Sequence, residues 1–383
     1  MDFEPDDEIE AFRAEVRAFL EVHLTPELDE QVYRTGVSHD DGFVRALAER
    51  GWIGTGWQHR DEDSPLAGWQ AHVLEDELTK VEAPIYAVWT TRMVASVIRA
   101  VGSEALQDEV LPPFLRGEVT IALGMTEPEA GSDVAAVRTR ARRDPDGDGW
   151  SIDGQKMFTT NAHLTDYVFL LTRTDPDVPR HAGLTMFLVP LDRPGIEIQA
   201  VYTLSGERTN IVFLNDVAVE DRWRLGEVDR GWQTLMLALQ DEHSAPFSPH
   251  LVRLLGAAEG WAEETGRIGE DEVQARLARW ATTLEVAQLL GLRATWMEVN
   301  GQVPAAEGPM SKLFSTESLI RAAEDVAQLV GPDALRSRLE PTAVAGGRIE
   351  HLLRFSLGTA IYAGTSEIQR TIIAQQACGL PRA

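Results

Sequence analysis

Three short stretches of the sequence combine hydroxyl, carboxylate and amine side chains with residues that turn the backbone. Residues 125–134 follow an apolar, strand-like run at 120–124, and the Glu127-Pro128 step ends that run because proline gives no hydrogen bond to a sheet. Gly131 lets the backbone come close to a bound group, and Ser132 and Asp133 add a hydroxyl and a carboxylate.

The second stretch, residues 156–161, places a lysine, a phenylalanine and two threonines close together. The third, residues 361–370, reads Ile-Tyr-Ala-Gly-Thr-Ser-Glu-Ile-Gln-Arg. The first stretch sits between predicted strands, whereas a Rossmann fingerprint and a P-loop both need a Gly-rich turn from a strand into a helix. Taken singly, each of the three stretches could also be an ordinary turn.

The elements that must position these stretches change in type twice along the chain. From about residue 8 to 116, apolar residues such as Ile9, Phe12 and Val16 recur at helical spacing. From 119 to about 228 the spacing becomes two, which predicts a small antiparallel barrel or sandwich. From Gly231 the helical spacing returns. We therefore predict an α+β protein with domains at 1–118, 119–229 and 230–383. Strand-like runs lie at 120–124, 138–141, 150–154, 167–171, 184–189 and 209–213.

Composition narrows the possible functions. The 383 residues suggest two or three domains, and the formal net charge of −26 argues against nucleic acid and anionic membrane surfaces as partners. The acidic N-terminus lacks the basic and then apolar pattern of a signal peptide, and no apolar run is long enough to span a membrane. The single cysteine, Cys378, excludes an internal disulfide, and the scattered histidines predict no metal site. A reducing cytoplasm is the expected location.

In this order, the three stretches resemble the FAD-dependent acyl-CoA dehydrogenase family, and the resemblance covers nearly the whole chain. It implies an N-terminal helical domain, a central antiparallel β-domain and a C-terminal four-helix bundle. It also implies α,β-dehydrogenation of an acyl-CoA thioester, in which a base removes the α proton while hydride leaves the β-carbon for flavin N5. Electrons would then pass to an electron-transfer flavoprotein or a similar acceptor.

The resemblance assigns flavin contacts to the first two stretches. Thr126 would hydrogen-bond the isoalloxazine ring, and Ser132 would contact the pyrophosphate or the thioester. Phe158 would shield the dimethylbenzene edge, where the family often has Trp, and Thr160 would donate toward N5. The full expected set of FAD-binding residues is Leu123, Met125, Thr126, Ser132, Phe158, Thr160, Gln328, Gly331, Thr365 and Glu367.

The last four of these residues come from the C-terminal third. Gln328 and Gly331 resemble residues that hold the adenine end of FAD, although Pro332 follows where more glycines are usual. Thr365 matches a flavin-contacting residue. Glu367 lies beyond the motif and could instead be a solvated or capping carboxylate.

The base that is common in the family is missing. Many members carry a catalytic glutamate between Tyr and Gly of the third stretch, where this chain has Ala363, and a methyl group cannot accept a proton. Other members place the base on a helix after a Gly-aromatic pair, here 231–232, and alignment from that pair puts Glu242 at the base position. Leu235, Leu239 and Glu242 share one helical face, which supports this role. The alternative is an exposed glutamate in a polar run.

The resemblance also implies a substrate site. Its expected residues are Ser132, Asp241, His243, Ala363 and Gly364, with the Ala363 N–H on the thioester oxygen. His243 stands where the family often has Arg. Pro246 and Pro249 interrupt the helical pattern, so that either the helix ends early or the pocket beside the base is widened for a bulky acyl group, such as a steroid side chain.

A second departure concerns assembly. Family members usually reach across a dimer interface to the FAD with an Arg near a Phe-Gly pair, but here Arg276 and Arg279 stand without that pair. We therefore expect a homologous second subunit in an α2β2 heterotetramer, similar to the paired acyl-CoA dehydrogenases that actinobacteria use on steroid side chains. The alternatives are a homotetramer in which Arg276 or Arg279 reaches across, a non-catalytic partner subunit, and a flavin oxidase or monooxygenase on the same fold.

Overall fold

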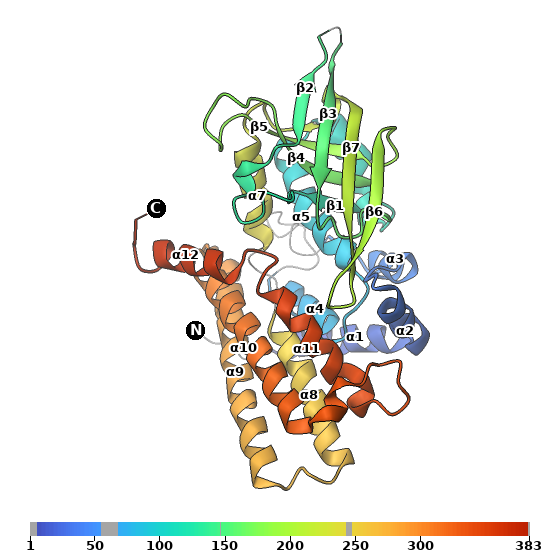
Figure 1. Cartoon of the computed structure of the whole chain (residues 1–383), viewed down its shortest axis with the longest axis vertical. Coiled ribbons are helices and arrows are strands. Elements are labelled where there is room, and N and C mark those ends of the chain that lie inside the picture. The colour runs from blue at the N-terminus through green and yellow to red at the C-terminus, as the bar shows by residue number, and fades with distance from the viewer. Residues whose placement is uncertain (1–5, 55–67, 146, 243–246, 382–383) are drawn as a thin grey trace.

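The computed structural model describes residues 6–54, 68–145, 147–242 and 247–381. The chain forms a helical N-terminal part, a β-sheet and a helical C-terminal part, and the sheet stands at one end of the molecule with the bundle at the other (Figure 1). This order confirms the α+β architecture predicted from the sequence. The exact domain limits at 118 and 229 stay a prediction.

The N-terminal part contains α1 (Asp7–His23), α2 (Pro26–Thr35), α3 (Asp41–Glu49), α4 (Trp69–Lys80), α5 (Tyr86–Val101) and α6 (Glu104–Leu115). Polar side chains cap the N-terminal ends of several helices. The Asp6 side chain accepts from Ile9 N at 2.9 Å, and Asp40 Oδ1 accepts from Phe43 N at 2.8 Å. Phe12, Phe19 and Trp52 form one apolar core through edge-on ring contacts.

The sheet contains β1 (Ile121–Gly124), β2 (Arg140–Arg143), β3 (Gly149–Lys156), β4 (Tyr167–Arg173), β5 (Leu184–Pro190), β6 (Ile196–Tyr202), β7 (Arg208–Glu220) and β8 (Arg224–Leu225). Its order is β6-β7-β3-β2-β4-β5-β8, with β1 paired to β4. Short 3₁₀ turns lie at η2 (Val134–Ala136) and η3 (Asp221–Trp223). Most strand pairs are antiparallel as predicted, but β1 and β4 run parallel, because the chain returns beside Thr120 before β4 begins.

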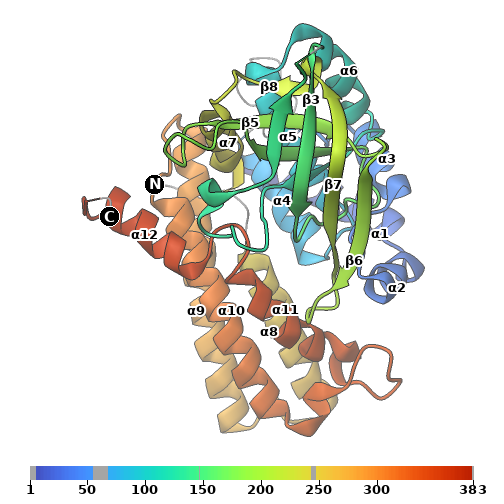
Figure 2. The same cartoon turned by 45° about the horizontal axis from the view of Figure 1, so that its top comes forward.

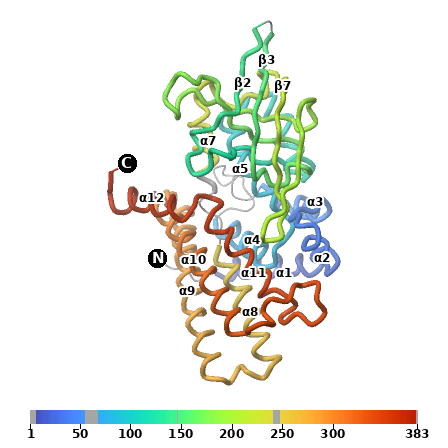
Figure 3. Tube along the Cα trace, in the orientation of Figure 1, coloured from blue at the N-terminus to red at the C-terminus, as the bar shows by residue number. Residues whose placement is uncertain are grey.

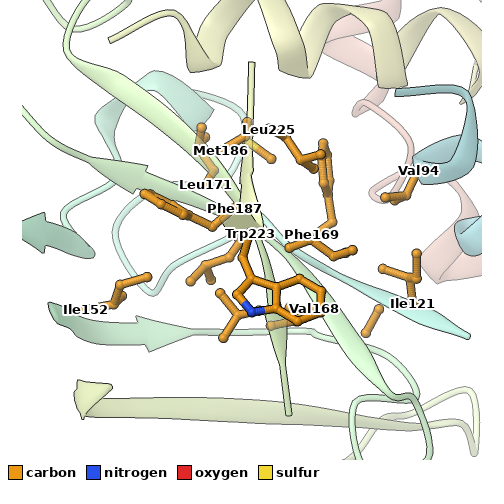
Figure 4. Packing of buried hydrophobic residues seen from close by; sticks show 14 of the residues in the cluster. Val94, Ile121, Ile152, Val168, Phe169, Leu171, Met186, Phe187, Trp223 and Leu225 are labelled. Atoms are coloured by element: carbon orange, nitrogen blue, oxygen red, sulfur yellow. The ribbon is translucent and has the colours of Figure 1, made fainter. Parts of the chain in front are cut away.

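Two helices complete the core of this sheet. Figure 4 shows Val94 of α5 beside Ile121, together with the packed side chains of Phe169, Phe187 and Trp223. Helix α7 (Gly231–Glu242) also packs on the sheet, because its Leu235 and Ala238 belong to the same buried cluster. The sheet domain therefore carries the helix on which the sequence places the expected base.

The bundle contains α8 (Ser248–Glu264), α9 (Asp271–Val299), α10 (Glu307–Val330), α11 (Arg348–Thr359) and α12 (Ser366–Gln376), with turns η4 (Pro332–Leu335) and η5 (Val344–Gly347) between α10 and α11. The course of these long helices is clearest in Figure 3. Their core is formed by residues such as Leu254, Trp280, Leu319 and Ile349. No helix in the described ranges is both long and apolar enough to cross a membrane.

Contacts distant in sequence hold the three parts together. The β6–β7 hairpin reaches the bundle, where Arg354 Nη1 donates to Leu204 O at 2.7 Å. The same hairpin meets the end of α2, where Arg208 N donates to Gly36 O at 2.8 Å. Residues that follow η4 also hold α2: the Tyr33 and Ser337 hydroxyl oxygens lie 3.2 Å apart, and Arg338 forms an ion pair with Asp29.

Candidate functional site

A buried ion pair joins the first two stretches of interest. Lys156 Nζ lies 2.7 Å from Glu127 Oε1 and also donates to Met125 O at 3.3 Å. Lys156 is completely buried. The Glu127 carboxylate accepts further hydrogen bonds from Arg138 N at 2.6 Å and Thr139 N at 2.9 Å. The pair therefore fixes the loop at 125–130 to the end of β3 and to the segment that leads into β2.

The electrostatics of this pair follow from its burial. Burial lowers the pKa of Lys156 to about 8, even though Glu127 opposes the shift. Burial alone would raise the pKa of Glu127, but the Lys156 charge and the hydrogen bonds outweigh it, so that this pKa lies below its ordinary value. Both groups are therefore charged at neutral pH.

The loops that this pair holds present Thr126 and Phe158. Thr126 O accepts from Met157 N at 2.8 Å, so the two segments run side by side. Leu123, Met125 and Thr126 are half-buried. Phe158 has a left-handed backbone with φ 57° and leaves 55% of its surface exposed. An exposed phenyl ring in a strained turn is suited to stacking on a flat ligand.

Thr159 and Thr160 follow this ring. The Thr159 backbone is fixed by Asn210, which accepts at its carbonyl from Thr159 N at 2.9 Å and donates from Nδ2 to Thr159 O at 3.0 Å. The Thr160 hydroxyl lies 3.1 Å from that of Thr209. Thr160 is half-buried, so its hydroxyl stands at the edge of the same surface as Phe158.

Ser132 and Asp133 lie in an exposed turn before η2. Asp133 Oδ2 forms an ion pair with Arg180 Nη1 at 2.6 Å. Arg173 Nη2 also donates to Ala135 O at 2.6 Å and ties this turn to β4. The acidic side chain is therefore balanced locally, which reduces its repulsion of an anionic ligand near Ser132.

The third stretch forms a turn between α11 and α12, on the side of the bundle that faces the sheet (Figures 1 and 2). Ala363 and Gly364 both have left-handed backbones, with φ 52° and 80°. Their carbonyls are held by Gln369 Nε2 at 2.8 Å and Lys312 Nζ at 2.5 Å. Their N–H groups donate to no acceptor in the part of the chain that the structure describes. Such a turn can bind a partly negative oxygen.

Thr365 and Glu367 begin α12. Thr365 caps this helix by accepting from Ile368 N at 3.3 Å. Glu367 is exposed, and hydrogen bonds from its own N–H and from the Thr365 hydroxyl lower the pKa of its carboxyl. This geometry supports the capping role that the sequence left open for Glu367, while its flavin contact stays a prediction.

Gln328 and Gly331 do not join the other flavin residues within one chain. Gln328 is exposed near the C-terminal end of α10, and Gly331, with φ 83°, ends that helix. The C-terminal end of α10 lies at the end of the bundle remote from the sheet (Figures 1 and 2). A ligand held by the sheet loops could meet these two residues only on another copy or subunit.

The two arginines considered for the cross-subunit contact differ. Arg276 is engaged within its own chain, with Nη1 3.1 Å from Asp325 Oδ1 and Nη2 2.7 Å from Glu272 Oε1. Trp280 Nε1 donates to the same Asp325 at 2.7 Å. Arg279 is exposed. Arg276 would have to break these contacts to reach a neighbouring ligand.

The expected base lies at the end of α7. The backbones of Asp241 and Glu242 form the last turn of that helix, and their side chains lie outside the described part of the structure. His243 and Pro246 fall in residues 243–246, which are also outside it. Pro249 stands in the first turn of α8, where a missing N–H is harmless. The roles of Glu242, Asp241 and His243 stay predictions.

Sequence reasoning missed three residues that hold this site: Lys156 with its partner Glu127, and Gln369. Lys156 lies four residues after the buried Ile152 on β3, which gave a weak signal, but its partner Glu127 lies 29 residues away. Within the described ranges, no group of three or more His, Cys, Asp or Glu could hold a metal ion.

Comparison with known proteins identifies the family. Residues 6–118, 122–217 and 248–378 match the N-terminal, middle and C-terminal domains of acyl-CoA dehydrogenases. The chain is 30% identical to acyl-CoA dehydrogenase FadE26 of Mycobacterium tuberculosis, over 98% of this chain and 97% of that protein.

Solved structures agree with this assignment. The Tcur3481-Tcur3483 steroid ACAD aligns with a TM-score of 0.92 at 30% identity, over 100% of both chains. The ChsE4-ChsE5 complex from Mycobacterium tuberculosis aligns with a TM-score of 0.89 at 29% identity, again over 100% of both chains. The chain therefore belongs to the FAD-dependent acyl-CoA dehydrogenase family and is an oxidoreductase that acts on acyl-CoA.

Proposed function

We propose that this enzyme removes hydrogens from the α and β carbons of a bulky acyl-CoA, such as a steroid side-chain thioester. The observation that carries the proposal is the convergence of two surfaces typical of this chemistry. The sheet presents Thr126, Phe158 and Thr160, and the turn between α11 and α12 lies on the side of the bundle that faces the sheet. Within the described residues, the N–H groups of Ala363 and Gly364 in this turn donate to no acceptor. Neither surface needs the glutamate that Ala363 replaces.

FAD fits the described residues. An exposed Phe158 ring beside the Thr160 hydroxyl suits a flat ring with polar edges, and Thr126 and Ser132 add hydrogen-bonding groups along the same loop. Leu123 and Met125 would pack beside it, and Thr365 would contact it from the bundle. When bound, FAD accepts the hydride that leaves the β-carbon.

The protein's own part is to remove the α proton and to stabilise the enolate that forms. Glu242 would take the proton, because it ends a helix that is fixed to the sheet by Leu235 and Ala238. The N–H of Ala363 would hold the thioester oxygen, where negative charge develops. Because the backbone donates this bond, the Ala363 side chain does not weaken it. Asp241, His243 and Gly364 would complete the substrate contacts.

The size of the acyl group is inferred from Pro246 and Pro249, which follow the expected base in the sequence and interrupt the helical pattern there. The similar proteins include a steroid ACAD. Both observations favour a wide acyl site over a narrow one for straight chains.

A second subunit would complete the FAD site. Gln328 and Gly331 lie away from the sheet loops, and Arg276 is bound to Asp325 and Glu272. Two solved relatives are named as two-protein assemblies, Tcur3481-Tcur3483 and ChsE4-ChsE5. We therefore favour an α2β2 heterotetramer with a homologous chain, with an electron-transfer flavoprotein or a similar acceptor as the electron partner.

Substitution of Glu242 by Gln tests the catalytic role. The amide cannot take a proton, so we expect the variant to keep FAD and to lose roughly a thousandfold or more in turnover. The measurement is anaerobic bleaching of the flavin by a panel of acyl-CoAs, with E264Q, which changes an exposed glutamate at the end of α8, as the control. Near-normal bleaching of the Glu242→Gln protein would show that Glu242 is not the base. Bleaching by butyryl-CoA in preference to every ring-bearing thioester would contradict the proposal of a wide acyl site.

Expression of the chain alone tests the assembly. We expect poor FAD retention and a mass below that of a tetramer, because an unpaired pyrophosphate at a partly buried site is costly. A stable, fully flavinylated homotetramer would contradict the heteromeric proposal. A chain that takes up FAD with its partner but is never bleached would instead support a non-catalytic subunit, and peroxide production under air would indicate an oxidase or monooxygenase.

A further inference from the structure

A polar cluster lies where the three parts of the molecule meet, and neither FAD binding nor proton removal requires it. Its members are Glu82, Glu207, His250, Arg253 and His351, here called the junction cluster. Glu82 stands in the turn between α4 and α5, Glu207 in the β6–β7 hairpin, His250 and Arg253 on α8, and His351 on α11.

The charged members of the junction cluster satisfy one another. Glu82 forms an ion pair with Arg253, and His351 Nε2 lies 3.3 Å from Glu82 Oε1. Burial would raise the pKa of Glu82, but Arg253 and His351 outweigh it and hold this pKa far below its ordinary value. Glu207 accepts from the Ser205 hydroxyl at 2.7 Å, and burial raises its pKa. The Glu82 charge is therefore paired within the cluster, whereas the Glu207 carboxylate has only a hydroxyl partner among the residues that the structure describes.

Two ring nitrogens in the junction cluster have no such partner. Nδ1 of His250 and Nδ1 of His351 are both buried, and neither forms a hydrogen bond with any residue that the structure describes. His250 is only 9% exposed, and His351 is largely buried. Buried polar atoms are normally hydrogen-bonded, because an unpaired one costs about 1–3 kcal/mol. A bound molecule would account for both nitrogens.

The protonation of the two rings defines what they can bind. Burial, and then the charge of Arg253, lowers the pKa of His250 to about 3, so this ring is neutral and carries one donor and one acceptor nitrogen. The Glu82 carboxylate can only accept, so His351 donates to it from Nε2, and Nδ1 is the ring nitrogen left for a ligand. The junction cluster thus offers two ring nitrogens, and that of the neutral His250 can donate or accept according to its tautomer.

A row of aromatic rings connects this cluster to the turn at Ala363. Tyr362, the residue before Ala363, lies 6.1 Å from Phe247 between ring centroids. Phe247 lies 6.3 Å from His250, and His250 lies 4.8 Å from Phe355. Phe355 in turn lies 6.0 Å from His351. These rings form a continuous packed row from the turn at Ala363 to the junction cluster.

We propose that the junction cluster binds a hydroxyl group on the acyl part of the substrate, remote from the thioester, through His250 and His351. This inference rests on the proposed function. A hydroxyl fits because it donates one hydrogen bond and accepts another, which matches the two nitrogens. A carboxylate does not fit, because Glu82 and Glu207 stand beside the rings and would repel it. The expected substrate class is a ring-bearing acyl-CoA with a distal alcohol.

The test compares two thioesters that differ only in this hydroxyl. The flavin-loaded enzyme, in its native assembly, is mixed anaerobically with a ring-bearing acyl-CoA and with its deoxy counterpart, and kcat/KM is measured for each. We expect the wild type to favour the hydroxylated compound by roughly 10- to 100-fold, because its site would leave polar groups unpaired around the deoxy compound. His250→Phe should abolish this preference by slowing only the hydroxylated compound.

Two further variants separate recognition from structure. His250→Gln keeps a donor and an acceptor and should restore most of the preference, whereas His72→Phe, which changes a histidine on α4 outside the cluster, should leave it intact. If His250→Phe slows both compounds equally, or if the wild type treats them alike, the junction cluster is only structural and the inference is overturned. If neither compound bleaches the wild-type flavin while the protein holds FAD, the proposed function fails first.

Discussion

The buried pair of Lys156 and Glu127 allows a quantitative test of how the flavin-side loops are held. Replacing Lys156 by Met keeps the length of the side chain and removes its charge. Glu127 then stays buried with two backbone N–H donors but without a cation. Loss of one partner of a buried pair costs about 3–5 kcal/mol, and we expect the lower end of this range because the N–H donors remain.

Thermal unfolding measures the effect, and the amount of FAD that the protein retains is a second readout. At about 2.1 cal/mol/K of unfolding entropy per residue, 383 residues give roughly 1.2 °C per kcal/mol, so the K156M melting temperature should fall by about 4 °C. The E127Q/K156M double variant keeps an acceptor for one of the two N–H groups of Arg138 and Thr139 and buries no charge, so it should recover part of the loss. R142M, which breaks an exposed ion pair with Asp153, is the control and should cost less than about 1 kcal/mol.

The pH dependence of the stability gives a second test of this pair. The pKa of Lys156 is about 8 in the folded protein and about 10.5 when unfolded. Between these values the unfolded chain binds the proton that the folded chain has lost, so the contribution of Lys156 to the unfolding free energy rises with pH. The gap in melting temperature between wild type and K156M should therefore widen from pH 8 to 10. A K156M protein that melts like R142M, with a gap that does not change with pH, would refute the reasoning.

Two further predictions concern the contacts that assemble the N-terminal part. Burial would raise the pKa of Glu77, but Arg17, Lys80 and Arg13 lower it to about 2, so its stabilisation is present above the unfolded pKa of about 4.5 and is lost as the pH falls toward 2. At pH 7 the free energy of unfolding of E77Q should lie about 3 kcal/mol below that of the wild type, and near pH 2 the two should be equal. Thermal melts across this range measure the difference. The same difference in melting temperature at both pH values would contradict the prediction. Gly36→Ala places a Cβ 2.3 Å from Gly206 O at a φ of 67°, so its melting temperature should fall well below that of Gly51→Ala, which meets no neighbour at a φ of 72° and should lose only about 1 kcal/mol. Equal melting temperatures for the two glycine variants would show that the close approach of the β6–β7 hairpin to Gly36 does not matter for stability.

Local signals made most of the fold predictable. The helical spacing of Ile9, Phe12 and Val16 places α1, and the strand-like runs at 167–171 and 184–189 fall within β4 and β5. β6 was missed because it is an edge strand, with Glu197 exposed between the half-buried Ile196 and Ile198. The parallel pairing of β1 with β4 was also missed, because it depends on the return of the chain beside Thr120, which no local pattern records.

The candidate site was likewise predictable only in part. Residues 125–134, 156–161 and 361–370 were recognised from their sequence, yet the left-handed backbone of Ala363 was not, because alanine rarely adopts it. The structure shows that Lys312, 52 residues earlier in the chain, holds the carbonyl of Gly364 in this turn. Contacts of this kind depend on packing between helices, and a single sequence carries no direct signal for them.

The attachment of α2 also has a consequence for how the chain is made. Asp29 and Tyr33 are held by Arg338 and Ser337, which lie 309 and 304 residues later in the sequence. At a synthesis rate of about 5–20 residues per second, these partners leave the ribosome roughly 15–60 s after α2 does. During this interval α2 has no buried residue of its own to hold it in place. The nascent chain therefore carries this helix without its Asp29 and Tyr33 contacts until the connection between α10 and α11 has been translated, and a ribosome that stalls before Ser337 would release a protein in which α2 lacks both contacts.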